Sequence, residues 1–370
     1  MGLLFMLLIL LATKGAAQEI DTLVDIGGAK MHFHVITGKG IPILFEAGGG
    51  NDGTVWKKLL PPLSDITGTT LITYDRMGLG KSDPDTSRYR IAKGIEALET
   101  GLKKLGYNKD IILVAHSLGG FYSTLYASRH PQNVKAAVLI DINYIGFFTD
   151  EQLTKMTASS DTSQVQRFKD AVFADIIQLM KNITFPLSIP VIDIVSEKTS
   201  FEGTADAERW KEVHKEFVSA VKNRQGITAY ESGHYVFLFN PQLVINTIVK
   251  AYTNCIGESP AFQVLKRAND YALIASNDVK KQYGKYMHSE DDLNEWGYSL
   301  LNKGNGQQAI EIFKLNTFLH PESANVFDSL ADAYERSGDK TPAIQYYRKC
   351  LEINPNKMHA QKRLKVLTSQ

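Results

Sequence analysis

The stretch IILVAHSLGG, residues 111–120, decides the fold of this chain. A continuous apolar run ends at Ala115, and Ser117 and two glycines follow before a helical pattern begins at Phe121. A buried strand that turns sharply into a helix needs small side chains on both sides of the turn. Ala115 stands where the G-x-S-x-G pattern has its first glycine. Such a turn would lift the Ser117 hydroxyl above the sheet, which makes Ser117 a candidate nucleophile. The alternative is a tight turn with an inert serine.

The composition is that of an ordinary globular protein. The 370 residues leave room for two domains, and 41 Lys and Arg against 40 Asp and Glu leave a net charge of +1. A net charge so close to zero does not indicate a surface that binds polyanions, so nucleic acid is not an expected partner. The two cysteines, Cys255 and Cys350, fall on helical patterns in different predicted domains. We interpret them as small apolar side chains, not as a disulfide framework.

Residues 1–17 are predicted to be a signal peptide. Residues 3–12 are almost all apolar but too few to span a bilayer, and Gly15 and Ala17 supply small residues before a cleavage site. The positive residue expected near the start is missing, so a buried strand or a membrane anchor are the alternatives. No later segment is long and apolar enough to cross a membrane. We therefore expect an exported protein, periplasmic or secreted, without a transmembrane segment after signal removal.

Residues 18–258 alternate short apolar runs with amphipathic helices. The stretch 90–106 has one apolar face at helical spacing. This alternation predicts an α/β fold with a mostly parallel sheet covered by helices on both faces. The segment at about 146–185 interrupts the alternation and is predicted to form a helical lid over the site. The predicted strands are 41–46, 70–74, 111–115, 136–140, 190–195 and 227–230, after an antiparallel lead-in near 23–26 and 31–36.

The pattern becomes all-helical after residue 258, beginning with a predicted connector over 259–288. Pairs of similar residues then recur 34 positions apart, among them Ala309 with Ala343 and Pro321 with Pro355. This is the period of the tetratricopeptide repeat, in which a small residue sits where the paired helices touch and a proline ends the second helix. Residues 289–370 are therefore predicted to form two such repeats and a closing helix.

Acyl transfer requires a nucleophile, a base, an acid that orients the base, and donors for the oxyanion. The candidate base is His234, which follows the last predicted strand and lies downstream of Ser117. The first oxyanion donor is expected to be the backbone N–H of Leu118, where the helix begins. The second is expected from the glycine run after the strand 41–46. We choose Gly49, because a glycine lets a backbone N–H approach a ligand closely.

The orienting acid is open to more than one interpretation. Thr199 stands where an aspartate is expected after the strand 190–195. Asp141, at the end of the preceding strand, is our choice, and Glu197 is the alternative acid. Asp193 is a poorer candidate because it lies inside an apolar strand. Asp141 has a structural alternative of its own, as a buried acid that caps its loop.

Other polar residues are interpreted as structural. Asp75 and Arg76 follow the strand 70–74 and are expected to form a pair that holds their loop. His32 and His34 alternate on one strand and are interpreted as packing residues. Because no third ligand is near them in the sequence, we predict no metal site, and nothing in the chain suggests a cofactor.

Several segments together resemble the α/β-hydrolase superfamily. In that family the matching serine and histidine are nucleophile and base, whereas the usual acid after the penultimate strand is not matched here. The C-terminal part resembles repeat tails of exported bacterial hydrolases, which implies a bacterial origin. The matching segments are FEAGGG (45–50), YDRMGLGKS (74–82), AHSLGG (115–120) and SGHY (232–235), the last followed by NPQLV (240–244).

The chain is therefore predicted to be a serine hydrolase that cleaves a small carboxylic ester, in preference to an amide, through an acyl-enzyme. A serine nucleophile argues against the epoxide hydrolase or dehalogenase chemistry that the resemblance would otherwise allow. The alternatives are an aminopeptidase or acyltransferase on the same fold, or a non-catalytic scaffold whose repeats bind protein. Two repeats are fewer than independent stability usually requires, so we expect them to dock on the connector, on the hydrolase domain or on a second copy of the chain.

Overall fold

The computed structural model describes residues 18–149, 164–230, 232–265, 267–268, 290–302, 304 and 306–369. The predicted signal peptide, part of the predicted lid (150–163) and most of the predicted connector (266 and 269–288) lie outside the described residues. The chain divides into two compact units, residues 1–271 and residues 272–370. Each unit is considered by itself.

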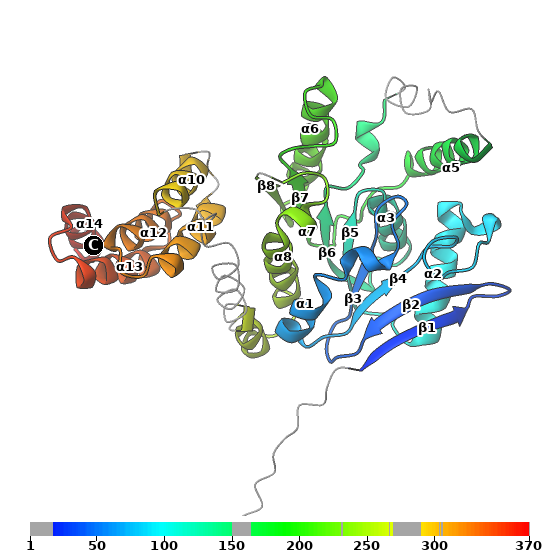
Figure 1. Cartoon of the computed structure of the whole chain (residues 1–370), viewed down its shortest axis with the longest axis horizontal. Helices are drawn as coiled ribbons and strands as arrows, with labels where there is room; N and C mark the ends of the chain where they lie inside the picture. Colours follow the sequence, from blue (N-terminus) through cyan, green and yellow to red (C-terminus); the bar gives the residue numbers. More distant parts are fainter. Residues whose placement is uncertain are drawn as a thin grey trace, which may run out of the picture. The chain divides into compact units, whose positions relative to one another are not determined.

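The first unit is built on one eight-stranded sheet (Figure 1). Its strands lie in the order β1-β2-β4-β3-β5-β6-β7-β8, and the pairs β1–β2 and β2–β4 are antiparallel whereas all later pairs are parallel. The predicted mostly parallel sheet with an antiparallel lead-in is confirmed. The strands are β1 (Glu19–Asp25), β2 (Lys30–Ile36), β3 (Ile43–Glu46), β4 (Leu71–Tyr74), β5 (Ile111–His116), β6 (Val134–Ile140), β7 (Val191–Ser196) and β8 (Arg224–Ala229).

Helices cover the sheet on both faces, which explains why β5 is apolar throughout. Alternate side chains of a strand point to opposite faces, and Leu113 packs in one core cluster while Val114 packs in the other. The first cluster lies under α2 (Ile91–Leu105), α3 (Gly119–Arg129), α5 (Gln164–Met180) and α6 (Ala205–Ser219). The second lies under α1 (Leu60–Thr67), α7 (Val236–Phe239) and α8 (Pro241–Thr253).

Short helical turns occupy the loops around the sheet. They are η1 (Gly53–Trp56), η2 (Thr86–Arg88) and η3 (Ile145–Phe147). The described ends of the predicted lid consist of η3 and α5, and the buried Ile176, Ile177 and Met180 attach α5 to the first core cluster. Within the described ranges, none of the helices combines the length and the apolar character needed to cross a bilayer.

The start of the predicted connector packs on the first unit. Val264 and Ala268 are buried in the second core cluster, and Arg267 Nε donates a hydrogen bond of 2.6 Å to the carbonyl oxygen of Ile66 in α1. The first unit therefore continues beyond residue 258, where the change of sequence pattern had placed its end.

The second unit consists of helices in the described residues. Ala309 and Ala343, predicted to lie where paired helices touch, are fully buried. Cys350 is also buried, as expected of a small apolar side chain, and Cys255 is partly buried, both as free thiols. Two helical hairpins are followed by a closing helix. The helices are α10 (Glu290–Asn302), α11 (Gly306–Leu319), α12 (Ala324–Arg336), α13 (Lys340–Ile353) and α14 (Met358–Thr368).

A chain that ends at Gly257 should unfold at a lower temperature than a chain that ends at residue 271. The shorter chain loses the burial of Val264 and Ala268 and the hydrogen bond from Arg267. Burial of these two side chains is worth about 2 kcal/mol, which for a unit of this size lowers Tm by about 5 °C. Calorimetry of both chains tests this, and equal Tm values would show that the segment adds no stability.

Candidate active site

Ser117 lies on a strained turn between β5 and α3. Its φ angle is 52°, and in the described part of the chain only Asp110 and Asp141 are other non-glycine residues with positive φ. A side chain in this left-handed region costs about 1 kcal/mol or more. The turn is held by the Ser117 N–H, which donates to Ile140 O at 3.2 Å, and by the Ser117 carbonyl, which accepts from Asn143 N at 3.1 Å. This is the geometry of a nucleophile elbow.

The two glycines after Ser117 are required by close packing. A Cβ atom on Gly119 would lie 2.6 Å from the carbonyl oxygen of Ala47, and one on Gly120 would lie 2.5 Å from Cβ of Ile142. No real Cβ is accommodated at such distances. The start of α3 therefore sits directly against the ends of β3 and β6, which places the Ser117 turn beside both strand ends.

Asp141 follows β6 and is the most heavily hydrogen-bonded carboxylate of the site. Its side chain is fully buried. Oδ2 accepts from His234 Nδ1 at 2.7 Å and from Ser196 Oγ at 2.8 Å, and Oδ1 accepts from Ser196 N and Trp210 Nε1, both at 2.9 Å. Burial alone would raise the pKa of Asp141, but the hydrogen bond from His234 and the charge of His214 outweigh burial and hold the pKa below its ordinary value. Asp141 is therefore ionised at neutral pH.

His234 lies on the loop between β8 and α7, with its side chain 22% exposed. Because Nδ1 faces the Asp141 carboxylate, Nδ1 carries the proton and Nε2 has the free electron pair that a base needs. The His234 ring packs against the ring of His116, the residue before Ser117, with centroids 4.6 Å apart and an angle of 46° between the ring planes. Within the described residues the structure shows no hydrogen bond between Ser117 Oγ and His234. Such bonds are often long before substrate binds.

The other acids have different surroundings. Asp193, the poorer candidate, is buried in β7 and accepts from His214 Nδ1 at 2.7 Å and from the Tyr144 hydroxyl at 2.8 Å. Glu197, the alternative acid, begins the loop after β7, where its N–H donates to the carbonyl oxygen of Ala229 at 3.0 Å. Of Asp141 and Glu197, Asp141 is the residue with a defined hydrogen bond to His234.

His116 is a site residue that sequence reasoning missed. Its ring is fully buried, and Nε2 donates a hydrogen bond of 3.0 Å to the backbone carbonyl of His234. Burial, together with the nearby His234, lowers the pKa of His116 to about 3, so the ring is neutral at working pH. His116 thereby attaches the loop of the candidate base to the strand that carries Ser117. The only indication of this role in the sequence was that His116 directly precedes Ser117.

The two residues predicted to supply oxyanion donors, Gly49 and Leu118, are neighbours in space. Gly48 to Asn51 form a tight turn in which Asn51 N donates to Gly48 O at 3.3 Å, and Gly50 takes the positive φ of 72° that the third position of a type II turn requires. A Cβ atom on Gly49 would lie 3.4 Å from Cδ2 of Leu118. Leu118 is the N-cap residue of α3, where backbone N–H groups lie outside the helical ladder.

Asp75 and Arg76 do not form the expected pair with each other. Arg76 donates to Glu46 Oε1 at 2.6 Å, to Ala47 O at 2.7 Å and to the carbonyl oxygen of Gly48. Asp75 instead accepts from Gly53 N at 2.8 Å. The predicted pairing was wrong because successive side chains of an extended segment point to opposite sides. Both residues hold the segment 47–53, which we call the glycine loop.

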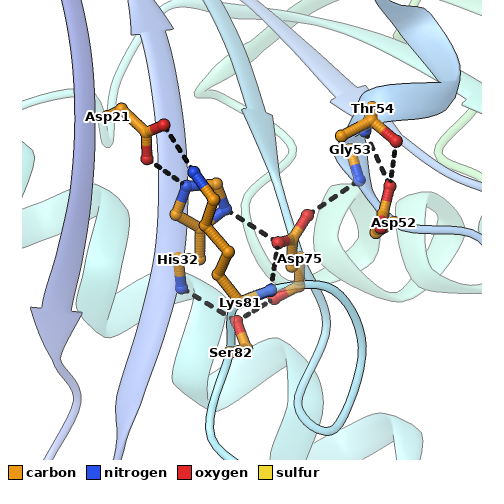
Figure 2. A network of polar contacts seen from close by, with 8 residues as sticks. All are labelled: Asp21, His32, Asp52, Gly53, Thr54, Asp75, Lys81 and Ser82. Carbon is orange, nitrogen blue, oxygen red and sulfur yellow. Dashed lines mark hydrogen bonds and ion pairs between the residues drawn. The ribbon is translucent and has the colours of Figure 1, made fainter.

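His32 anchors Asp75, and its interpretation as a packing residue was wrong. Figure 2 shows the His32 ring between two carboxylates, with Nδ1 2.7 Å from Asp75 Oδ2 and Nε2 2.5 Å from Asp21 Oδ1. Lys81 Nζ lies 2.6 Å from the other Asp21 oxygen. Hydrogen bonds from Lys81 and then His32 lower the pKa of Asp21 to about 2. This network ties the loop after β4 to the antiparallel strands β1 and β2.

The described residues contain no group of three His, Cys, Asp or Glu side chains placed to hold a metal ion. An eight-stranded, mostly parallel sheet, with an elbow serine after its fifth strand and a histidine–aspartate pair at the same edge, is the arrangement of an α/β hydrolase. The chain belongs to the α/β-hydrolase family: the model of the alpha/beta hydrolase fold matches residues 41–247, more than half of the chain. A tetratricopeptide-repeat model matches residues 324–357. The α/β-hydrolase and tetratricopeptide-repeat assignments made from the sequence are confirmed.

The chain is similar to several known proteins. It is 26% identical over 258 residues to the uncharacterized protein YqjL of Bacillus subtilis, and the match covers 68% of this chain and 99% of that protein. It is 37% identical over 84 residues to a proline iminopeptidase of Saccharolobus solfataricus, which covers 22% of this chain and only 27% of that enzyme. A serine hydrolase involved in carbazole degradation has a solved structure with 18% identity and a TM-score of 0.48, covering 63% of this chain and 98% of that one. Membership of this family indicates a hydrolase.

The buried His116 should make stability depend on pH. Its folded pKa of about 3 lies below the ordinary value of 6.5, so below pH 6.5 the unfolded chain binds a proton that the folded chain does not. Stability from this residue is full above pH 6.5 and falls as the pH decreases toward 3. Between pH 7 and pH 5 the loss is about 2 kcal/mol.

Urea unfolding of the wild type and of His116→Gln at both pH values measures this loss. Glutamine keeps an N–H donor for the His234 carbonyl but does not titrate, so the variant should lose about 2 kcal/mol less than the wild type over the same interval. All other titrating groups are shared and cancel in the comparison. Equal losses in the two proteins would mean that His116 takes up its proton in the folded state.

Proposed function

We propose that this chain is a serine hydrolase that cleaves carboxylic esters through a covalent acyl-enzyme. Ser117 is the nucleophile, His234 the general base and Asp141 the orienting acid, and the N–H groups of Gly49 and Leu118 bind the oxyanion. The observation that carries the proposal is the 2.7 Å hydrogen bond between His234 Nδ1 and the buried Asp141, beside the strained Ser117 turn.

The reaction begins when His234 Nε2 removes the proton of Ser117 Oγ as that oxygen attacks the ester carbonyl carbon. The negative charge that develops on the carbonyl oxygen is stabilised by the N–H groups of Gly49 and Leu118. The protonated His234 then gives its proton to the departing alcohol, which leaves an acyl group on Ser117. A water molecule, deprotonated by His234, attacks the acyl carbon and releases the carboxylic acid and the free serine.

Asp141 supports each proton transfer without being protonated itself. Its charge stabilises the imidazolium form of His234, and its hydrogen bond with Nδ1 holds the ring in the tautomer with a free Nε2. The three bonds from Ser196 and Trp210 fix the carboxylate itself. Ser196 supplies two of these bonds, one from its backbone N–H and one from its hydroxyl. It ends β7, the strand after which an acid was expected. We infer that these donors allow an acid at the end of β6 to do the work of the acid that the family usually has after β7.

The choice of an ester follows from the nucleophile. Attack by Ser117 on an acyl carbon gives an ester that water can hydrolyse, whereas attack on a halogenated carbon would give an ether that water cannot cleave under these conditions. Relatives of the chain include haloalkane dehalogenases, at 26% identity over 161 residues, and Ser117 separates this chain from that chemistry. An amide would require the same residues but a poorer leaving group, so an ester is the first substrate class to test.

The scaffold alternative requires an inert hydrolase unit. The bonds of Asp141 to Ser196 and Trp210 would also suit a structural acid, but the hydrogen bond to His234 Nδ1, which leaves Nε2 as a base, is what catalysis requires and a scaffold does not. The repeats are of a type that mediates protein–protein interaction. We propose that they recruit a protein partner, or a second copy of the chain, to an active enzyme.

A fluorophosphonate should label the full-length wild type at one site, and Ser117→Ala should remove the label. The matched control is Ser128→Ala, near the end of the helix α3 that follows Ser117, where the hydroxyl donates to the carbonyl oxygen of Leu125 at 2.8 Å. That variant should label at the wild-type rate. Intact-protein mass spectrometry gives the result directly. A folded wild type that takes no label would favour the scaffold alternative.

Asp141→Asn should lower kcat for a nitrophenyl ester by about 10³- to 10⁴-fold, because the amide removes the charge that stabilises the imidazolium and disturbs the tautomer. Glu197→Gln, which tests the alternative acid, should change kcat by less than about threefold. The two variants differ from the wild type by the same chemical change. If Glu197→Gln shows the large loss and Asp141→Asn does not, the acid is Glu197.

A further inference from the structure

We propose that Arg76 is a positioning residue that orients the oxyanion donors of the active site from beneath the glycine loop. This role rests on the proposed serine-hydrolase function. Arg76 follows β4, is buried with about 10% of its side chain exposed, and is not part of the triad. Its guanidinium contacts one carboxylate and two backbone carbonyls, and both carbonyls belong to the glycine loop.

The planar guanidinium fixes two successive peptide planes. Nη1 donates to Ala47 O at 2.7 Å, and Nη2 donates to Gly48 O. In a trans peptide the carbonyl and the following N–H point in opposite directions. When Arg76 holds the carbonyl of Ala47 it also directs the N–H of Gly48 away from itself, and when it holds the carbonyl of Gly48 it does the same for the N–H of Gly49.

The loop needs an external clamp because its own residues supply little restraint. Residues 48–50 are three successive glycines, the residue type with the largest conformational freedom. One turn hydrogen bond, from Asn51 N to Gly48 O, closes the loop on itself. Asp75 holds its far end at Gly53, where the N–H donates to Oδ1 at 2.8 Å. Arg76 holds the near end, next to the candidate donor.

The restrained glycine lies next to the residue that follows the nucleophile. A Cβ atom on Gly49 would be in van der Waals contact with the Leu118 side chain, 3.4 Å from Cδ2, and Leu118 is the residue that follows the nucleophile. Rotation of the Gly48–Gly49 peptide would turn the Gly49 N–H away from the orientation that Arg76 sets, and would leave the hydrogen bond between His234 and Asp141 in place. The described hydrogen bonds of Arg76 go to Glu46, Ala47 and Gly48, and to no residue of the proposed triad.

Glu46 makes the buried cation possible. Its Oε1 lies 2.6 Å from Arg76 Nη1, and its other oxygen accepts from the Tyr74 hydroxyl. The Tyr122 ring covers the guanidinium, with its centroid 4.7 Å from Cζ. An unpaired buried cation would be strongly destabilising. Because the pair has no net charge, the effect of Arg76 on the oxyanion comes from the geometry of the loop and not from a positive field.

Arg76→Gln tests the proposal in the full-length enzyme. Glutamine is neutral and shorter, and it cannot hold two carbonyls in the fork geometry of a guanidinium. Loss of one oxyanion donor lowers kcat by about 10²-fold or more, while KM for a nitrophenyl ester should stay within about threefold. The affinity for a trifluoromethyl ketone, which forms a tetrahedral adduct on the serine, should fall by the same factor as kcat/KM.

Two further variants complete the experiment. Arg129→Met is the control, because Arg129 is an exposed arginine at the end of α3 that pairs with Glu99. This variant should leave kcat and ketone affinity unchanged. Arg76→Lys keeps a positive charge beside Glu46, so it tests the role of Arg76 even if Arg76→Gln does not fold. Its compact ammonium cannot span both carbonyls, and we expect about a tenfold loss in kcat and in ketone affinity, with KM retained.

The outcomes separate this proposal from the one on which it rests. Wild-type kcat and ketone affinity in folded Arg76→Gln or Arg76→Lys would overturn the positioning role while leaving the triad intact. A rise in KM with an unchanged kcat would also overturn it, because that pattern reports a substrate contact. Failure of the serine-hydrolase proposal itself would appear as activity that survives in Ser117→Ala.

Discussion

The buried carboxylate of Asp141 is the group on which the candidate active site depends. It joins the ends of β6 and β7, the helix α6 through Trp210, and the loop of His234. An ionised group with no exposure is tolerated only when its oxygens are fully hydrogen-bonded. The four donors meet that requirement, and three of them, from Ser196 and Trp210, lie outside the proposed triad. The fourth, His234, is thereby held where the adjacent strand end presents Ser117.

A second constraint acts on the other side of the site. The three successive glycines of the glycine loop have no side chains with which to keep their shape, and the neighbouring residues Asp75 and Arg76 hold the loop at both ends. Asp75 binds the backbone at Gly53, Arg76 binds it at Ala47 and Gly48, and His32 fixes Asp75 to the antiparallel strands (Figure 2). The lead-in strands thus contribute to the active site through this network and not only to the core.

Local pattern was sufficient for the fold and for part of the site. The apolar run of β5, the small residues around Ser117 and the strand–loop–helix context of His234 are short-range signals, and the structure confirms the sheet they predicted. The acid could only be narrowed to two residues, since the contact between Asp141 and His234 spans 93 positions. The contacts of Arg76 with Glu46 and of His32 with Asp75 span 30 and 43 positions. The pattern of residues within one segment cannot identify partners so far away in the sequence. For this reason Arg76 was predicted to pair with its neighbour Asp75, and His32 was interpreted as a packing residue.

The crystal structure of the adduct formed with a phosphonate ester is the strongest test of the proposed site, because the phosphoryl oxygen occupies the place of the oxyanion. We expect phosphorus bonded to Ser117 Oγ, with the phosphoryl oxygen about 2.7–3.1 Å from the N–H groups of both Gly49 and Leu118 and with His234 still hydrogen-bonded to Asp141. Phosphorus on another side chain, or an oxygen that points into solvent away from both N–H groups, would contradict it.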